Sequence, residues 1–293
     1  MRKVWIEAAL NGPWGRARQS GIPVAVAEIV ADGVAAAEAG AAIIHVHAYD
    51  EAAGRQRDDW EIYARIIEGV RARIDAIVYP TIPLSGSDFA GGVGGRFAHT
   101  EELAKRGLIE WTVADPGSVN FVRYDEMAEP GAGFVYQNAP ADLAEGLRIA
   151  RAYGVHPGYA IYEPGFTRLG AALAAVAPRA PTPIYRFMFS EGFAWGFPPQ
   201  ERFLDAHLDL LAQAAPGAPW MAAGLGVDIR PLVAPVVARG GHLRVGLEDA
   251  PFGSTWSNRR WVEEARRLIE IAGGEAASAA DVRRDLAATR PAG

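Results

Sequence analysis

The chain has 293 residues, half of them hydrophobic, with a mean hydropathy of +0.01 and a formal net charge of −6. This length suits one large α/β barrel as well as two smaller domains, and the acidic balance argues against a general affinity for nucleic acid. The absence of cysteine excludes disulfides and a cysteine nucleophile, so any metal must be held by His, Asp or Glu. Neither a signal peptide nor an apolar run of about 18 residues is apparent, so we expect a cytoplasmic protein.

Short apolar runs alternate with amphipathic stretches along the chain, which predicts strands followed by helices. In chain order these units are Lys3–Leu10 with Val24–Ala39, Ala41–His47 with Asp58–Arg73, Ala76–Thr81 with Thr100–Arg106, Leu108–Val113 with Asp142–Tyr153, Gly158–Tyr162 with Phe166–Val176, Ile184–Phe189 with Glu201–Ala214, Trp220–Ala223 with Ile229–Ala238, and His242–Leu247 with Asn258–Ala272. Their number and the lack of a polar linker predict one closed (β/α)8 barrel spanning residues 1–293. A doubly wound open sheet is the alternative.

Three segments depart from this alternation. Residues 115–139 form an insertion after the fourth strand, in which Val119–Val122 and Gly133–Tyr136 are expected to pair as a hairpin. Ala280–Ala288 is expected to be an extra C-terminal helix. The glycine-rich run Gly91–Gly95 matches neither a dinucleotide fingerprint nor a P-loop, so we interpret it as a flexible lid over the barrel mouth.

Two histidines end the second predicted strand. His45 and His47 are spaced i, i+2, so their side chains share one face, with Cα atoms about 6.5–7 Å apart. They fall at the carboxyl end of a barrel strand, where catalytic groups gather. This spacing favours a metal pair, and the alternative is two hydrogen-bonded histidines in a crowded mouth.

Acidic residues end the eighth predicted strand. Arg244 and Glu248 share a face, and with the two histidines Glu248 completes a common ligand set for a catalytic zinc. Asp249 falls on the opposite face unless the strand ends before it. The alternative is that Arg244 and Asp249 form an ordinary structural ion pair.

These motifs, in their order and spacing, resemble the β-keto acid cleavage enzymes, whose best-known activity is 3-keto-5-aminohexanoate cleavage. The resemblance covers nearly the whole chain and rests on Ala9–Gly12, His45–His47, Gly117–Phe121, Tyr162–Gly165, Gly240–Asp249 and Ser257–Asn258. It implies a zinc-dependent (β/α)8 barrel, usually a homotetramer. It also implies condensation of a β-keto acid with acetyl-CoA, which gives acetoacetate and a new acyl-CoA through a metal-stabilised enolate and retro-Claisen cleavage.

The resemblance assigns roles to particular residues. It implies metal ligands at His45, His47 and Glu248, and an acid/base pair at Arg244 and Asp249. It also implies substrate-holding groups at Thr81 and Ser118, with Asn120 nearby. Glu163, which ends the fifth predicted strand, and Trp14, expected over the mouth, are further candidates for contact with substrate.

The sequence departs from the family pattern at several positions. Tyr49 stands where the family has an arginine, and Trp14 stands where it has an acidic residue for an amino-bearing substrate. We therefore expect an uncharged, apolar substrate tail. Three questions stay open: whether the metal is zinc or another divalent ion, whether the enzyme is instead a zinc hydrolase or an aldolase-type lyase without CoA, and whether the barrel only binds a small acid.

Overall fold

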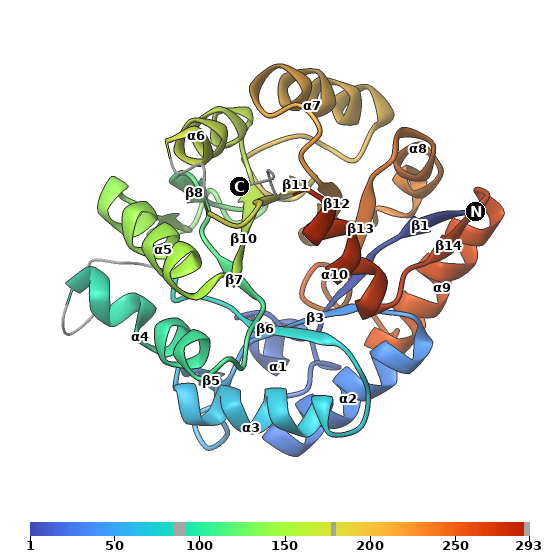
Figure 1. The fold of residues 1–293 in the computed structure, drawn as a ribbon. Helices are drawn as coiled ribbons and strands as arrows, with labels where there is room; N and C mark the ends of the chain where they lie inside the picture. The colour runs from blue at the N-terminus through green and yellow to red at the C-terminus, as the bar shows by residue number, and fades with distance from the viewer. Residues whose placement is uncertain (85–91, 177–179, 290–293) are drawn as a thin grey trace.

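The computed structural model describes residues 1–84, 92–176 and 180–289 (Figure 1). In this part of the chain, one sheet contains eight parallel strands: β2 (Ile6–Ala9), β3 (Ile43–Val46), β6 (Ile77–Pro80), β7 (Trp111–Val113), β10 (His156–Ile161), β11 (Ile184–Phe189), β12 (Trp220–Gly224) and β13 (His242–Val245). Their order is β6-β3-β2-β13-β12-β11-β10-β7. The end strands β6 and β7 contact each other without a hydrogen-bonded ladder between their described residues, so the barrel is nearly closed.

Helices surround this barrel in Figure 1. They are α2 (Val26–Ala39), α3 (Trp60–Arg71), α4 (Gly92–Lys105), α5 (Pro140–Tyr153), α6 (Pro164–Ala175), α7 (Glu201–Ala214), α8 (Val233–Arg239), which follows the 3-10 turn η1 (Arg230–Leu232), and α9 (Asn258–Ile271). Local sequence fixes some of their ends: the Asp59 side chain accepts a hydrogen bond from the Glu61 amide, and Ser257 does the same for Arg260. The predicted α/β barrel fold is confirmed, and the open sheet is excluded.

Smaller elements decorate the barrel. The predicted hairpin is confirmed as β8 (Val119–Phe121) with β9 (Phe134–Tyr136), paired antiparallel. The C-terminal helix is confirmed as α10 (Ala279–Ala288). The sequence prediction missed the short helix α1 (Gly15–Arg18), the hairpin β4 (Tyr49–Asp50) with β5 (Arg55–Gln56), and β14 (Gly274–Ala276), which pairs with β1 (Arg2–Val4).

The first predicted strand is wrong in one respect, because Lys3–Leu10 forms two strands interrupted at Trp5. The Trp5 amide donates to Nδ1 of His242 at 3.1 Å, and its indole stacks on that imidazole with ring centroids 3.8 Å apart. Before this point the chain pairs with β14, outside the barrel, and after it the chain pairs inside the barrel with β3 and β13. The strand therefore changes its pairing partner at Trp5, where the His242 side chain accepts the backbone hydrogen bond.

The lid interpretation is wrong for residues 92–95, because they form the start of α4, and Gly91 lies outside the described residues. The helix therefore begins well before the predicted Thr100. Arg96, in its second turn, is fully buried and donates to the carbonyl oxygens of Pro83 and Gln137. Its guanidinium also lies 3.4 Å from Asp142. These tertiary contacts hold a helical turn that the glycines alone would disfavour.

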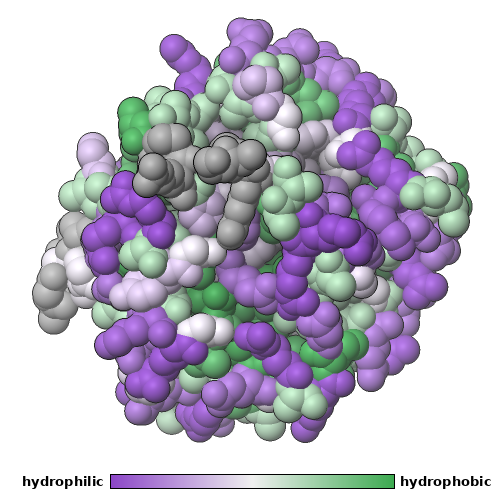
Figure 2. Space-filling view, viewed as in Figure 1, coloured by the Kyte–Doolittle hydropathy of each residue, from purple (hydrophilic) through white to green (hydrophobic). Residues whose placement is uncertain are grey.

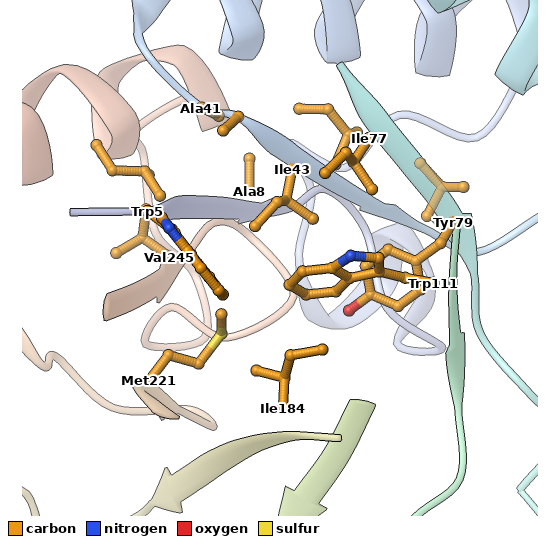
Figure 3. Packing of buried hydrophobic residues seen from close by; sticks show 14 of the residues in the cluster. Trp5, Ala8, Ala41, Ile43, Ile77, Tyr79, Trp111, Ile184, Met221 and Val245 are labelled. Carbon is orange, nitrogen blue, oxygen red and sulfur yellow. The ribbon is translucent and has the colours of Figure 1, made fainter. Parts of the chain in front are cut away.

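Large apolar side chains fill the barrel interior below the carboxyl ends of its strands (Figure 3). Trp5 and Trp111 meet edge to face with centroids 6.1 Å apart, and Ile43, Ile184 and Met221 are fully buried around them. This packing closes the barrel from below, so that the open end lies at the strands' carboxyl termini.

The helix α10 lies across the amino-terminal end of the barrel. The Trp5 indole donates to Asp285 at 2.9 Å, and Arg283 bonds to Glu110, which precedes β7. The face shown in Figure 2 is mostly hydrophilic, with hydrophobic side chains only in scattered small groups. Across the described ranges, no helix has the length and apolar character needed to cross a bilayer.

Candidate active site and metal centre

His45 lies in β3, and His47 directly follows the last residue of that strand; both side chains are buried. The Nδ1 atom of His47 lies 2.8 Å from the Oε1 atom of Gln56, on β5. The amide nitrogen of Gln56 donates to Asp58 at 3.0 and 2.9 Å, so its carbonyl oxygen is the atom that faces the imidazole. His47 therefore carries its proton on Nδ1, which leaves the lone pair of Nε2 for a ligand.

Glu248 and Asp249 enter the barrel mouth from a turn rather than from a strand. The sequence predicted a strand to Leu247, but β13 ends at Val245. At Gly246 the backbone has φ +138°, and a Cβ atom there would lie 2.2 Å from the carbonyl oxygen of Ala9. Only glycine fits this approach, and the turn that follows brings both adjacent carboxylates inward.

The three predicted metal ligands meet in the structure. Nε2 of His45 lies 3.6 Å from Oε2 of Glu248, and Nε2 of His47 lies 3.4 Å from Oε1. One donor atom from each of the three residues lies within 4.8 Å of the others. Ligand atoms bound tetrahedrally to zinc at about 2.1 Å are roughly 3.4 Å apart, so these separations fit such an ion.

Hydrogen bonding within the cluster also fits a metal. Nε2 of His47 and Oε2 of Glu248 are buried and have no hydrogen-bond partner among the described residues. Burial holds the pKa of His45 well below its usual range, which favours the neutral imidazole that a metal needs. Burial opposes ionisation of Glu248, but Arg244 and the two histidines hold the pKa of its carboxyl well below the usual range.

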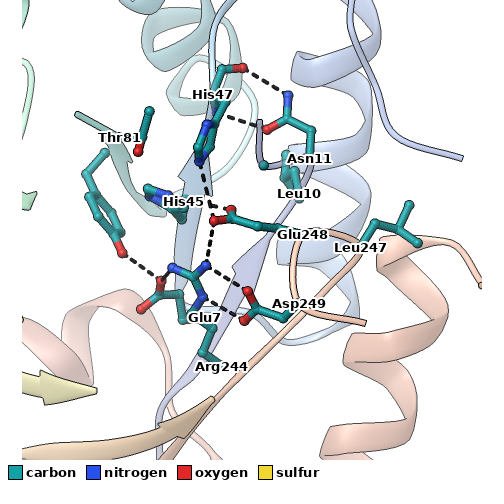
Figure 4. Close-up of polar contacts among 12 residues, drawn as sticks. Glu7, Leu10, Asn11, His45, His47, Thr81, Arg244, Leu247, Glu248 and Asp249 are labelled. Atoms are coloured by element: carbon teal, nitrogen blue, oxygen red, sulfur yellow. Dashed lines mark hydrogen bonds and ion pairs between the residues drawn. The ribbon is translucent and has the colours of Figure 1, made fainter. Parts of the chain in front are cut away.

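Arg244 connects the acidic groups of the site (Figure 4). Its Nε and Nη2 atoms donate to the two oxygens of Asp249 at 2.7 and 2.8 Å. Nη2 also lies 2.8 Å from Glu248, and Nη1 donates to Glu7 at 3.2 Å. Burial raises the pKa of the Asp249 carboxyl to about 7, and Arg244 opposes that shift. The arrangement gives a carboxylate that can exchange a proton, beside a candidate metal centre.

A cavity above this cluster is mainly apolar and aromatic. Its described lining includes the candidate metal ligands His45, His47 and Glu248, the polar residues Arg186, Arg244 and Asp115, and the largely apolar side chains Pro13, Trp14, Ile82, Leu84, Val113, Phe121, Phe134, Tyr136, Ala160, Tyr162, Met188 and Leu225. Phe121 is packed edge to face against Tyr136 and Tyr162, so the wall on that side is a continuous aromatic surface.

The predicted substrate-contact residues divide into two groups. Trp14 and Thr81 line the cavity, and the Trp14 indole donates to the carbonyl oxygen of Glu248 at 2.8 Å. Ser118 and Asn120 are exposed and are absent from the described lining. The Ser118 hydroxyl instead accepts from the Asn138 amide at 2.8 Å. Glu163 accepts from the Gly196 amide at 3.1 Å and is likewise absent from that lining.

Sequence reasoning missed several polar groups around the centre. Gln56 orients His47 from a two-residue strand that has no recognisable pattern. Glu7 and Arg186 are fully buried, and both interrupt otherwise apolar strands, which is a signal that could have identified them. Tyr49, which stands at the family's arginine position, donates its hydroxyl to the carbonyl oxygen of Gly12 at 2.5 Å.

Known proteins resemble this chain along almost its full length. The family model described as beta-keto acid cleavage enzyme matches residues 3–287. A 3-dehydrocarnitine:acetyl-CoA trimethylamine transferase of Rhizobium meliloti is 26% identical over 311 residues, covering 99% of this chain and 98% of the relative. A 3-oxoadipate:acetyl-CoA acetyltransferase of Cupriavidus necator is 28% identical over 295 residues, covering 95% of this chain and 92% of the relative.

Solved structures share the fold. A binary complex of ObcA with oxaloacetate superposes with a TM-score of 0.73 at 16% identity, covering 93% of this chain and 68% of that one. The 3-dehydroquinate dehydratase of Geobacillus kaustophilus gives a TM-score of 0.57 at 11% identity, covering 92% and 91%. These likenesses establish the barrel architecture, while the match of the family model establishes ancestry: the chain belongs to the β-keto acid cleavage enzyme family.

Proposed function

We propose that this protein transfers an acyl group from a β-keto acid to CoA, with zinc as its metal and acetyl-CoA as its co-substrate. The observation that carries the proposal is the contact between two units in the barrel mouth. The cluster of His45, His47 and Glu248 lies beside the bidentate pair of Arg244 and Asp249. The names of the relatives from Rhizobium meliloti and Cupriavidus necator support acetyl-CoA as the second substrate.

A divalent metal held by these ligands supplies Lewis acidity towards the keto oxygen of the substrate. Asp249 accepts a proton from the α-carbon, and Arg244 fixes the orientation of this carboxylate by donating to both of its oxygens. The α-carbon then bonds to the acetyl carbon of acetyl-CoA, and the carbon–sulfur bond breaks with release of the CoA thiolate. The thiolate attacks the original keto carbon, the old carbon–carbon bond breaks, and Asp249 returns its proton to the α-carbon of the departing acetoacetate. The products are acetoacetate and a new acyl-CoA.

The cavity walls support an uncharged, apolar substrate tail. Phe121, Tyr136, Tyr162 and Met188 line the space next to the metal cluster. The only carboxylate in the described lining apart from Glu248 is Asp115, and its two oxygens already accept hydrogen bonds from Tyr136 and the Ala160 amide. Burial also raises the pKa of Asp115, which disfavours its use as a partner for a cationic tail.

The test is acyl-CoA formation by zinc-loaded protein, with acetyl-CoA and a panel of β-keto acids bearing aliphatic, aromatic, anionic and cationic tails. We expect a new acyl-CoA, detected by mass spectrometry, from the aliphatic or aromatic acids. Cleavage of the same acids without acetyl-CoA would favour a hydrolase or lyase, and binding without turnover would favour a small-acid-binding barrel. A native mass in the same preparation tests the homotetramer that the family resemblance implies.

A further inference from the structure

Asn258 carries a buried amide that no step of the proposed reaction uses. It is the first residue of α9, and its side chain is 0% exposed. Its Oδ1 atom accepts a hydrogen bond from the Leu247 amide at 2.7 Å, and its Nδ2 atom donates to the Leu10 carbonyl oxygen at 2.8 Å. The same Nδ2 atom donates to Asp32, on α2, at 2.6 Å. The side chain therefore joins α9 and α2 to the chain just beyond two barrel strands, β13 and β2.

The orientation of the Asn258 amide is fixed by the backbone groups that it meets. The N–H of Leu247 can only donate, so it must face Oδ1, and the carbonyl of Leu10 can only accept, so it must face Nδ2. A leucine at position 258 has a similar size and makes neither bond. Both backbone groups are buried with their residues, so losing the amide removes partners that water does not readily replace.

One end of this amide supports the residue that lies directly before Glu248, in the turn that follows β13 (Figure 4). This residue, Leu247, belongs to no strand, so no ladder holds its backbone. Asn258 holds its N–H, while Nε2 of Gln19 donates to its carbonyl oxygen at 3.2 Å and to that of Pro251 at 3.4 Å. Gln19 is also fully buried. Two side chains from distant segments thus replace the missing ladder, one on each side of the turn.

The other end of the amide reaches the segment that supports the histidines. Leu10 directly follows β2, and its own N–H donates to the carbonyl oxygen of His45 at 3.1 Å. The next residue, Asn11, holds the backbone of His47 through its side chain. Asn258 therefore links the turn after β13 to the backbone of both candidate histidine ligands.

We propose that Asn258 is a positioning residue for the metal cluster, which sets the distance between the Glu248 carboxylate and the two histidines through the backbone on either side. This inference rests on the proposed function, which assigns these three side chains to one ion. Nε2 of His47 and of His45 lie 3.4 and 3.6 Å from the Glu248 oxygens, and a functional group must be held to within about 0.5 Å of its working geometry. A turn without a ladder needs such support from side chains.

The test compares Asn258→Leu with wild type in two measurements of metal binding. We expect zinc affinity, from competition with a chromogenic chelator, to fall roughly tenfold to a hundredfold. With Co²⁺ as the probe ion, the visible absorption bands should change in position or intensity, because they depend on the arrangement of the ligands. Asn138→Leu removes another buried asparagine, which donates to the carbonyl oxygen of Gly117, and is the matched control. It should match wild type in both measurements.

If Asn258→Leu does not fold, judged by near-ultraviolet circular dichroism, Gln19→Met tests the opposite side of the turn. Methionine keeps the length of the side chain without its donors, so zinc affinity should fall several-fold and the cobalt spectrum should change. Its control is Arg16→Met, which alters the exposed face of α1 where Arg16 pairs with Glu28.

A folded variant that binds zinc and cobalt as wild type does overturns the inference, even if its thermal stability is reduced. The outcome is separable from that of the proposed function. Altered metal binding in Asn258→Leu supports the inference whether or not acyl-CoA is formed, and acyl-CoA formation by wild type stands if the variant binds metal normally. A wild-type protein that binds no zinc overturns both.

Discussion

Asn11 and His47 form a reciprocal pair of hydrogen bonds. The Asn11 side chain accepts from the His47 amide at 2.9 Å and donates to the His47 carbonyl oxygen at 2.9 Å (Figure 4). The side-chain nitrogen of Asn11 also donates to the Pro23 carbonyl oxygen at 3.0 Å, so the orientation of the Asn11 side chain is fixed. Because β3 ends at Val46, Asn11 replaces the ladder that would otherwise hold the backbone of His47.

We predict that Asn11→Leu weakens zinc binding by roughly tenfold to a hundredfold, as is typical when a group that orients a ligand is lost. The measurement is a competition titration against a chromogenic chelator. Asn138→Leu removes a buried asparagine at the hairpin, away from the cluster, and should leave zinc affinity unchanged. Unaltered affinity in Asn11→Leu would mean that the barrel packing alone positions His47.

A direct test of the metal cluster is His47→Ala. Removing one of three ligands should lower bound zinc from about one ion per chain to a small fraction, measured by atomic absorption after dialysis. His207→Phe is the matched control, since it removes a buried histidine near Phe187, outside the cluster. Full zinc occupancy in purified His47→Ala would show that the ligand assignment is wrong.

The role of Asp249 is tested by Asp249→Asn. The amide keeps the shape of the side chain but cannot accept a proton, so kcat should fall by about a hundredfold or more while zinc content stays unchanged. Steady-state acyl-CoA formation and metal analysis on one preparation give both readouts. Glu7→Gln is the comparison, because it alters another carboxylate that contacts Arg244. An unchanged kcat in Asp249→Asn would make the Arg244 pair purely structural.

Trp14 is expected to control the choice of substrate tail. Its ring lies 5.2 Å from that of Phe252, and its indole nitrogen holds the Glu248 carbonyl oxygen. Trp14→Glu should shift preference from apolar towards cationic β-keto acids by at least about tenfold in kcat/KM ratio. Trp14→Phe separates the effect of charge from the loss of the indole hydrogen bond. Identical preferences in all three proteins would place the tail elsewhere in the cavity.

His207 makes stability depend on pH. It is 1% exposed, and neither ring nitrogen has a hydrogen-bond partner among the described residues. Burial lowers its pKa to about 4, below the value of about 6.5 in an unfolded chain. The unfolded state therefore binds the proton first as pH falls. The contribution of neutral His207 to the free energy of unfolding is complete above about pH 6.5 and decreases as the pH falls. It levels off below about pH 4, where the folded state is protonated too.

We predict that His207→Phe loses less stability than wild type between pH 7 and pH 4.5, by roughly 2–3 kcal/mol. Urea unfolding at the two pH values gives the free energies of unfolding. Only the change with pH is compared, so any packing effect of the phenylalanine cancels. Parallel losses in the two proteins would show that His207 is protonated in the folded state without cost.

Much of the fold and part of the site followed from local patterns. Alternating apolar runs predicted the barrel, and the i, i+2 spacing placed His45 and His47 on one face. The same period of two predicted that Glu248 points inward as part of a strand. In the structure the strand ends at Val245, and the turn at Gly246 positions both Glu248 and Asp249. The predicted ligand residues therefore lie together, and their role as metal ligands stays a prediction.

Other features depended on contacts that local patterns do not encode. Gln56 reaches His47 through a short hairpin, and Arg186 and Glu7 meet although 179 positions separate them in the chain. Trp5 divides the first strand because His242, from the other end of the sequence, supplies an acceptor. Periodicity determines which face of an element is buried, and so the sequence by itself determined the barrel and the residues of the candidate metal cluster. Only the tertiary structure decided how those residues are oriented and which charges they meet, because strand register and barrel closure set the distances between distant side chains.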